Sequence, residues 1–157
     1  MKSTKIYLLT FLIAVFPLSN TACFSDQPSV NVQWYSYDEG IEKGLQENKN
    51  IYINFYADWC SYCKQMDQST FSESYVYTYL NKYFIPIKVN VDKEPRVDKK
   101  YRVQPIPENW FLTEAGKKIA RRPGYIPPEL FIHYLKFVHT DSYKEMSFST
   151  FKKQQGS

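Results

Sequence analysis

Two cysteines placed between an apolar run and a helical stretch constrain this chain more than any other feature. Residues 51–57 form an apolar run of strand length, and Cys60 and Cys63 follow it closely, at the start of a helix that we expect to reach about Gln68. The pair therefore lies where a strand ends and a helix begins. Redox-active dithiols, zinc sites and c-type haem attachment sites all use a Cys-x-x-Cys spacing, so the neighbouring residues must decide among them.

The other residues that bind metals or haem argue against such a site. A structural zinc needs two ligands besides the two cysteines, and the only histidines are His133 and His139, whose spacing of six residues is unusual for zinc. A c-type haem needs a histidine directly after the second cysteine, where this chain has Lys64. The sequence favours a redox dithiol and predicts no metal ligands.

The position of the first cysteine predicts its chemistry. Unpaired backbone N–H groups and the dipole at a helix N-terminus favour a thiolate, and the thiolate is the species that attacks a disulfide. Cys60 is therefore the predicted nucleophile. Cys63, one turn later, is the predicted resolving thiol, which releases the substrate from a mixed disulfide. Lys64 adds positive charge nearby.

The N-terminus has the pattern of a targeting segment. Lys2 and Lys5 precede a mostly apolar run at residues 6–18, which is short for a membrane span, and small or polar residues follow it. We expect residues 1–22 to be a signal peptide and the protein to be exported to the periplasm, where disulfides persist. A retained N-terminal membrane anchor is the alternative.

Cys23 follows this segment directly and has two interpretations. The Ala22-Cys23 pair resembles a bacterial lipobox, which makes Cys23 a lipidated first residue, although Asn20 stands where lipoproteins usually carry an aliphatic residue. Simple cleavage near Ala22 instead leaves Cys23 as an unpaired thiol. Both interpretations stay open.

The size and charge of the chain limit its organisation and its partners. Its 157 residues suffice for one domain with a substantial core. A formal net charge of only +4 and the lack of a long basic run predict no nucleic-acid partner. We expect a linker at residues 23–36, the domain at 37–140, and a polar C-terminal tail that frays at 141–157.

Apolar periodicity predicts alternating helices and strands. Ile41 and Leu45, four residues apart, indicate an amphipathic first helix, and Ser72 is a candidate cap for the third. Strands separated by helices indicate an α/β sheet with parallel members, and a final hairpin adds an antiparallel pair. The expected helices lie near residues 38–48, 60–68, 72–83 and 95–101 and from Pro127 onward, and the strands near 51–57, 85–91, 110–112 and 117–121.

The stretch FYADWCSYCK at residues 55–64 resembles the active-site stretch of thioredoxins. It is more similar still to the C-terminal thioredoxin-like domain of DsbD-type thiol:disulfide interchange proteins. This resemblance implies a thioredoxin-like α/β fold, with a central mixed sheet of four to five strands flanked by helices. The likeness spans about residues 37–138 and includes residues 70–72, 90–92, 101–107 and 122–125.

The resemblance implies roles for several residues outside the dithiol. Pro107 corresponds to a proline that follows a cis peptide bond and faces the two cysteines, and with Ile106 and Trp59 it would form the substrate groove. Lys88 corresponds to a strand lysine beneath the active site, and an ordinary surface lysine is the alternative. Pro105 is expected to be an ordinary loop proline.

Three departures from the family pattern bear on reactivity. Asn54 replaces a buried aspartate that helps to move the proton of the resolving cysteine, and Asn cannot titrate, so Asp58, Glu108 or water would have to substitute. Glu108 replaces the usual threonine, and a carboxylate beside the groove would raise the thiol pKa or select basic substrates. Ser61 and Tyr62 replace Gly-Pro between the cysteines, and this pair tunes a reduction potential that varies by about 150 mV among such dithiols.

The resemblance implies a thiol:disulfide oxidoreductase of the cell envelope that acts as a reductant or isomerase on exported proteins. Its partners would be the thiols or disulfides of those proteins, with a separate membrane reductase as a hypothetical electron donor. No cofactor is expected besides the redox-active disulfide of Cys60 and Cys63. The alternative is a non-catalytic binding module in which the same disulfide is static.

Overall fold

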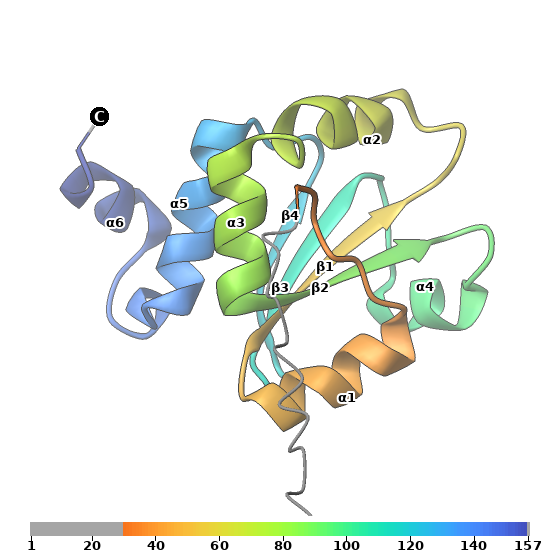
Figure 1. Cartoon of the computed structure of the whole chain (residues 1–157), viewed down its shortest axis with the longest axis horizontal. Helices are drawn as coiled ribbons and strands as arrows, with labels where there is room; N and C mark the ends of the chain where they lie inside the picture. The colour runs from red at the N-terminus through yellow and green to blue at the C-terminus, as the bar shows by residue number, and fades with distance from the viewer. Residues whose placement is uncertain (1–29, 157) are drawn as a thin grey trace, which may run out of the picture.

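A computed structural model describes residues 30–156 of the chain as helices arranged around one sheet (Figure 1). The predicted signal peptide and Cys23 lie outside the described residues. Along the chain the elements are α1 (Tyr37–Glu47), β1 (Asn50–Tyr56), α2 (Ser61–Gln65), the π-helical turn η1 (Met66–Thr70), α3 (Ser74–Tyr83), β2 (Phe84–Asn90), α4 (Pro95–Tyr101), β3 (Glu108–Leu112), β4 (Lys118–Pro123), α5 (Pro128–His139), the short 3-10 helix η2 (Ser142–Lys144) and α6 (Phe148–Gln154).

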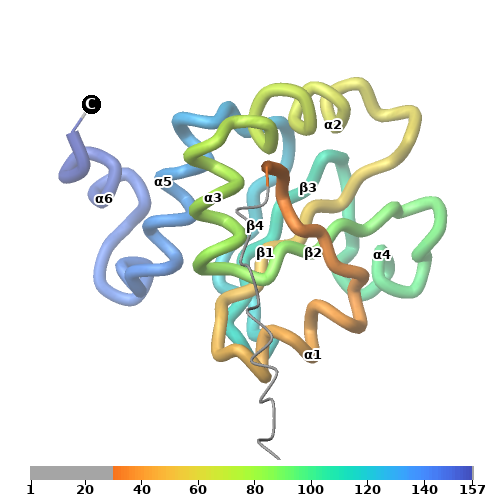
Figure 2. Tube along the Cα trace, viewed as in Figure 1, coloured from red at the N-terminus to blue at the C-terminus, as the bar shows by residue number. Residues whose placement is uncertain are grey.

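The sheet has four strands in the order β2-β1-β3-β4 (Figure 2). β1 pairs in parallel with β2 and antiparallel with β3, and β3 pairs antiparallel with β4. This confirms the expected mixed α/β sheet. β1 has a neighbouring strand on each side and packed side chains on each face. Its central residues are therefore buried, which explains why its sequence is mostly apolar.

Side chains alternate between the two faces of the sheet and form two separate cores. Tyr52 of β1 packs with residues of η1, α3 and α5 on one face, in a core rich in aromatic rings. Ile53 and Phe55 point to the other face and pack with residues of α1 and α4. The strand that leads to the cysteines is thus held from both sides.

The packing of α1 differs from the expectation. Leu45 is exposed, and the helix instead buries Tyr37, Gly40 and Gly44. A Cβ atom on Gly40 would lie 2.3 Å from a side-chain carbon of Ile87 in β2. The two glycines therefore let the helix backbone approach the sheet closely, which leaves Leu45 on the outer side.

The expected cap at Ser72 is wrong. α3 begins at Ser74 with Glu73 in the N-cap position. The hydroxyl of Ser72 donates a hydrogen bond back to the carbonyl of Gln68, at 2.7 Å, so Ser72 belongs to the end of the preceding helical segment. That segment widens into the π-helical turn η1 after α2, which carries the chain past the expected end at Gln68.

Part of the expected linker packs on the domain. Val32 is buried, and the backbone N–H of Tyr35 donates to the carbonyl of Pro86 in β2 at 2.9 Å. Tyr35 forms an isolated parallel bridge with Ile87. The described part of the linker is therefore tied to the edge of the sheet, because its apolar residues have a place in the cores. Across residues 30–156, no helix combines the length and apolarity needed to cross a bilayer.

The expectation that the C-terminal residues fray is wrong for the part that the structure describes. The Phe148 ring stacks on Tyr134 of α5, with ring centroids 3.8 Å apart, and Phe151 is buried. Ser147 caps α6 by accepting a hydrogen bond from the backbone N–H of Thr150 at 3.2 Å. Two phenylalanines one turn apart give this otherwise polar segment an apolar face that binds α5.

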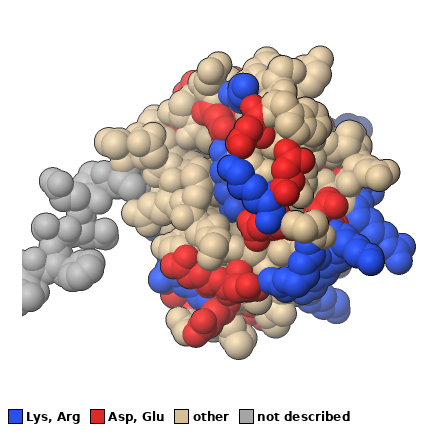
Figure 3. All heavy atoms as spheres, turned by 90° about the vertical axis from the view of Figure 1, so that its right-hand side faces the viewer, with Lys and Arg blue, Asp and Glu red and all other residues tan. Residues whose placement is uncertain are grey.

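The face that lies on the right of Figure 1 has mixed charge. Figure 3 shows acidic and basic side chains next to one another there. Among the ion pairs of the surface, Arg96 of α4 pairs with Asp38 of α1 at 2.9 Å. Such interspersed charges agree with the small net charge of the chain.

Candidate active site

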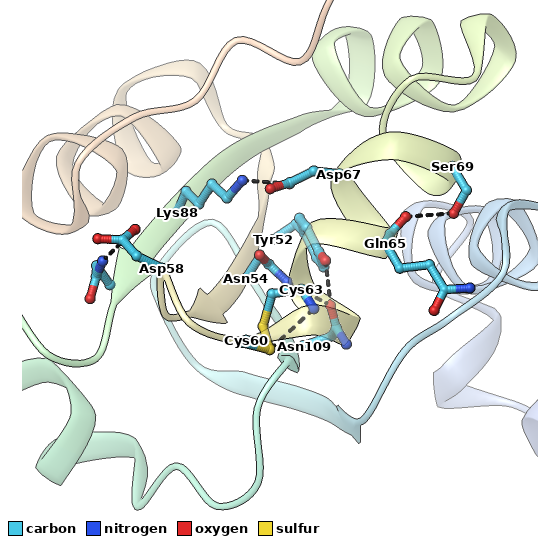
Figure 4. Close-up of polar contacts among 11 residues, drawn as sticks. Tyr52, Asn54, Asp58, Cys60, Cys63, Gln65, Asp67, Ser69, Lys88 and Asn109 are labelled. Atoms are coloured by element: carbon cyan, nitrogen blue, oxygen red, sulfur yellow. Dashed lines mark hydrogen bonds and ion pairs between the residues drawn. A yellow bond between two sulfur atoms is a disulfide. The ribbon is translucent and has the colours of Figure 1, made fainter.

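The two cysteines form a disulfide at the N-terminus of α2 (Figure 4). β1 ends at Tyr56, and the chain turns through a hydrogen bond from the backbone N–H of Cys60 to the carbonyl of Ala57, at 3.1 Å. Cys60 is the N-cap residue, and its sulfur accepts a hydrogen bond from the backbone N–H of Cys63 at 3.1 Å. The dithiol thus lies between strand and helix, as its place in the sequence predicts.

The disulfide is shielded, while the side chains around it are exposed. Cys60 and Cys63 are only 5% and 3% exposed, whereas Trp59 and Tyr62 are 69% and 62% exposed. Ile106 packs against the buried cluster that contains the two cysteines. The geometry suits a partner that rests on the aromatic side chains and presents a sulfur to the disulfide.

The Trp59 side chain is held in place by a residue that lies just after the end of β2. Its indole N–H donates to the carboxylate of Asp92 at 2.9 Å. The Asn90 side chain in turn accepts from the backbone N–H of Asp92 at 3.0 Å. Beside the indole lies a pocket of about 430 Å³, lined by Trp59, Val91, Asp92, Asp98, Val103, Gln104, Pro105 and Ile106.

The loop between α4 and β3 forms one wall of this pocket. The Ile106–Pro107 peptide bond is cis, as the resemblance implies, and the buried Pro107 accepts a hydrogen bond from the backbone N–H of Gly124 at 2.7 Å. The Gln104–Pro105 bond is also cis, so Pro105 is not the ordinary loop proline expected from the sequence. Both bonds precede proline, the one residue at which cis bonds are common.

Asn54 lies beneath the dithiol in a buried amide network (Figure 4). Its side-chain N–H donates to the side-chain oxygen of Asn109 in β3 at 3.2 Å, and the Tyr52 hydroxyl donates to the same oxygen at 2.5 Å. The Asn109 amide donates to the carbonyls of Arg122 and Gly124, each at 3.0 Å. All hydrogen-bonding capacity of Asn109 is therefore used.

This network has no group that titrates near neutral pH. Burial raises the pKa of the Tyr52 hydroxyl well above its ordinary value, so Tyr52 stays a neutral donor. Asn54 and Asn109 are amides. Sequence reasoning did not single out Asn109, although a polar residue directly before the apolar run at residues 110–112 was a signal for it.

Lys88 lies in register with Asn54 and reaches toward the helix that carries Cys63. Its ammonium forms an ion pair with Asp67 at 2.5 Å and lies 4.8 Å from the centre of the Tyr56 ring. Asp67 follows Cys63 by four residues on the same helical segment. Sequence reasoning missed Asp67, because its partner is distant along the chain.

Asp58 is exposed, and its carboxylate is paired with residues at the end of β2 and just after it. Its carboxylate accepts hydrogen bonds from the Asn90 amide and the Lys93 ammonium, both at 3.2 Å. These contacts hold Asp58 beside the loop after β2 and do not link it to the amide network under the dithiol.

Glu108 does not lie beside the groove as an unpaired charge. It points to the same face of the sheet as Phe55 and is fully buried. Its carboxylate accepts from the Trp110 indole at 2.6 Å and from the Arg121 Nε at 2.7 Å. The expected roles of repelling the thiolate or attracting basic substrates are therefore wrong, because Arg121 neutralises the carboxylate.

The two histidines lie in α5, whereas the cysteines lie at the start of α2. The His139 Nδ1 hydrogen-bonds with the Tyr79 hydroxyl at 2.8 Å, and its ring stacks on Tyr83. In the described part of the chain, no three His, Cys, Asp or Glu side chains are grouped so that they could hold a metal ion.

Comparisons with known proteins agree with this geometry. The model of the thioredoxin-like domain family matches residues 37–139. The chain is 27% identical over 143 residues to the thiol:disulfide interchange protein DsbD of Photorhabdus laumondii, a match that covers 83% of this chain and 25% of DsbD. It is 32% identical over 111 residues to the disulfide bond reductase DsbH of Chlamydia pneumoniae, covering 63% of this chain and 66% of DsbH. The chain thus spans less than two thirds of these relatives.

Solved structures show the same fold. A thioredoxin from Thermus thermophilus is 27% identical, with a TM-score of 0.63, and the match covers 69% of this chain and 87% of that one. A DsbH oxidoreductase has a TM-score of 0.59 at 22% identity, over 92% of this chain and 96% of that one. The DsbD C-terminal domain of Neisseria meningitidis has a TM-score of 0.55 at 20% identity, over 66% and 97%. The last two likenesses concern the fold alone.

Proposed function

The chain belongs to the thioredoxin-like domain family, and we propose that it is a thiol:disulfide oxidoreductase that exchanges disulfides with polypeptides through Cys60 and Cys63. The observation that carries this proposal is the disulfide at the N-terminus of α2, with the exposed Trp59 and Tyr62 beside it. This arrangement combines a sulfur that favours the thiolate state with a surface that a polypeptide can contact.

In the reducing direction the exchange has two steps. The Cys60 thiolate attacks one sulfur of the substrate disulfide, forms a mixed disulfide and releases the other substrate sulfur, which takes up a proton. The Cys63 thiolate then attacks the Cys60 sulfur, closes the internal disulfide and releases the second substrate thiol. Two electrons pass from the dithiol to the substrate, and the reverse sequence oxidises a substrate dithiol.

The contacts at the helix N-terminus favour Cys60 as the first nucleophile. Once the disulfide opens, the backbone N–H of Cys63 remains a donor to the Cys60 sulfur, and the helix dipole favours negative charge there. Cys63 lacks this position, because it lies within α2. Its deprotonation depends on a base other than Asn54, such as water, since an amide cannot accept the proton.

We also propose that the protein works in the cell envelope on exported polypeptides. The support is the sequence pattern at residues 1–22, with lipidation of Cys23 as one way of anchoring it. A membrane reductase would then supply electrons to Cys60 and Cys63. Fractionation of cells with mass spectrometry of the mature N-terminus tests the location, and a cytosolic protein that retains Met1 would contradict it.

Reduction of insulin tests the proposed activity. We expect the purified protein with dithiothreitol to precipitate the insulin B chain faster than dithiothreitol alone, and Cys60→Ser to abolish the acceleration. A static disulfide on a binding module would give no acceleration with either protein. The reduction potential of the Cys60–Cys63 pair then decides between a reductant and an isomerase.

A further inference from the structure

Glu108 and Arg121 hold the backbone of the loop that forms one wall of the pocket beside the dithiol. The backbone N–H of Gln104 donates to the Glu108 carboxylate at 3.1 Å. The carbonyl of the same residue accepts from the Arg121 guanidinium at 2.8 Å. Both polar backbone groups of Gln104 are therefore fixed by one ion pair.

This ion pair is built as a rigid support. Arg121 donates to both oxygens of Glu108, from Nε at 2.7 Å and from a terminal nitrogen at 2.9 Å. The Trp110 indole adds a third donor at 2.6 Å. Glu108 is fully buried, whereas the Arg121 side chain is 42% exposed. A buried carboxylate requires such complete pairing, so its position leaves little freedom.

The loop that the ion pair holds contains residues that line the pocket beside the dithiol. Gln104, Pro105 and Ile106 line the pocket next to Trp59, and Ile106 packs against the cysteine cluster. Neither Glu108 nor Arg121 lines this pocket. Within this pocket, the pair can therefore affect a substrate only through the loop.

We propose that Glu108 and Arg121 are positioning residues for polypeptide binding, which fix the loop at residues 104–106 as the wall against which a substrate chain rests. This inference rests on the proposed exchange at Cys60 and Cys63. It assigns Glu108 a role different from both roles expected from the sequence. The pair would set the affinity for polypeptides and leave the chemistry of the dithiol unchanged.

Two substrates separate positioning from chemistry. A peptide of about ten residues around a disulfide must rest on the loop, whereas hydroxyethyl disulfide needs only access to the sulfur. Displacing a binding wall raises KM and leaves kcat in place when the chemical step is untouched. A variant that merely destabilises the domain would instead lower the rate with both substrates.

Glu108→Gln is the first test variant, because it keeps the shape of the side chain and removes its charge. We expect its KM for the peptide to rise about tenfold at unchanged kcat. Its rate with hydroxyethyl disulfide and its reduction potential should equal those of the wild type. An unchanged peptide KM, or equal losses with both substrates, would overturn the proposal.

Arg121→Lys is the second variant, and it tests the positioning role on its own if Glu108→Gln does not fold. A lysine keeps the positive charge but cannot donate to both Glu108 oxygens and to Gln104 at once, so we expect a rise in peptide KM of about threefold. Arg96→Lys is the matched control, because Arg96 also pairs with a carboxylate through two hydrogen bonds, to Asp38. This exposed pair does not line the pocket and makes no hydrogen bond to Gln104. An equal effect of the control, or no effect of Arg121→Lys, would refute the proposed role.

The same measurements distinguish the failure of this proposal from that of the proposed function. If the wild type does not react with hydroxyethyl disulfide, the exchange itself is wrong. If it reacts while the two variants leave the peptide KM unchanged, only the positioning role is wrong.

Discussion

Asn54 in β1 donates a hydrogen bond to Asn109, its direct partner in β3, so two amides occupy the buried centre beneath the dithiol. The Tyr52 hydroxyl completes the network, and burial holds its pKa far above neutral. No member of the network accepts a proton at neutral pH. The second step of exchange, in which Cys63 must lose its proton, therefore lacks a base at this position.

Replacing one amide by an acid tests this conclusion. We expect Asn54→Asp to speed insulin reduction near neutral pH about three- to tenfold, since a general base typically contributes more than this where the pKa is well matched. The buried carboxylate should also lower the free energy of unfolding by about 1–3 kcal/mol. Asn109→Asp is the comparison, because its carboxylate would lose both hydrogen bonds to the Arg122 and Gly124 carbonyls. An unchanged or slower rate in Asn54→Asp would count against the assignment.

The close approach of α1 to the sheet predicts a strong effect of a single methyl group. In Gly44→Ala the new Cβ would lie 2.6 Å from a side-chain carbon of Ile51, so the Ile51 side chain, the helix or the strand must shift. We expect a loss of about 1–3 kcal/mol in the free energy of unfolding, measured by chemical denaturation. Leu45→Ala on the same helix is exposed and should change it by less than about 0.5 kcal/mol. A neutral Gly44→Ala would show that the helix packs less closely.

We expect the C-terminal helix α6 to contribute to the stability of the domain, although most of its residues are polar. Phe151 is buried against α5, so Phe151→Ala should cost about 2–4 kcal/mol. Limited proteolysis should then cleave α6 (Phe148–Gln154) before the rest of the domain. Lys152→Ala on the exposed side of the helix is the control. Equal proteolysis of the two variants would mean that α6 does not dock in solution.

The environment of His139 predicts a dependence of stability on pH. Burial lowers the pKa of His139 below its ordinary value of 6.5. Because the unfolded chain then binds the proton more readily than the folded one, stability should fall as the pH drops through 6.5 toward the folded pKa. His133 has a lowered pKa for the same reason. We expect His139→Phe to weaken the decline in melting temperature between about pH 7 and 5.5, and a decline identical to that of the wild type would exclude His139 as its source.

Local patterns were sufficient to predict the sheet and the dithiol. The apolar runs that became β1 and β2 and the Cys60-x-x-Cys63 spacing are properties of short segments, and the structure places the disulfide between strand and helix as expected. Leu45 was misjudged because hydrophobic periodicity does not register close backbone contact through glycines. The C-terminal helix was missed because two phenylalanines carry its whole apolar face.

The partners of the polar residues could not be predicted, since they are distant along the chain. Glu108 shares a face with Trp110, which strand alternation indicates, but its pairing with Arg121 depends on the register of β3 and β4. Asp67 likewise meets Lys88 only because the helix after the dithiol lies over β2. The sequence therefore identified Glu108 and Lys88 as candidate residues, whereas their partners Arg121 and Asp67 became evident only from the fold.

The most direct test of thiol–disulfide exchange is a trap for the mixed disulfide. Cys63→Ser removes the resolving thiol, so mixed disulfides formed through Cys60 should accumulate. They should appear on non-reducing gels as additional bands that are lost after treatment with dithiothreitol. The double variant with Cys60→Ser is the control and should show none. We expect such mixed disulfides with reducible polypeptides in Cys63→Ser alone. Their absence, or equal amounts in the double variant, would rule out exchange through Cys60.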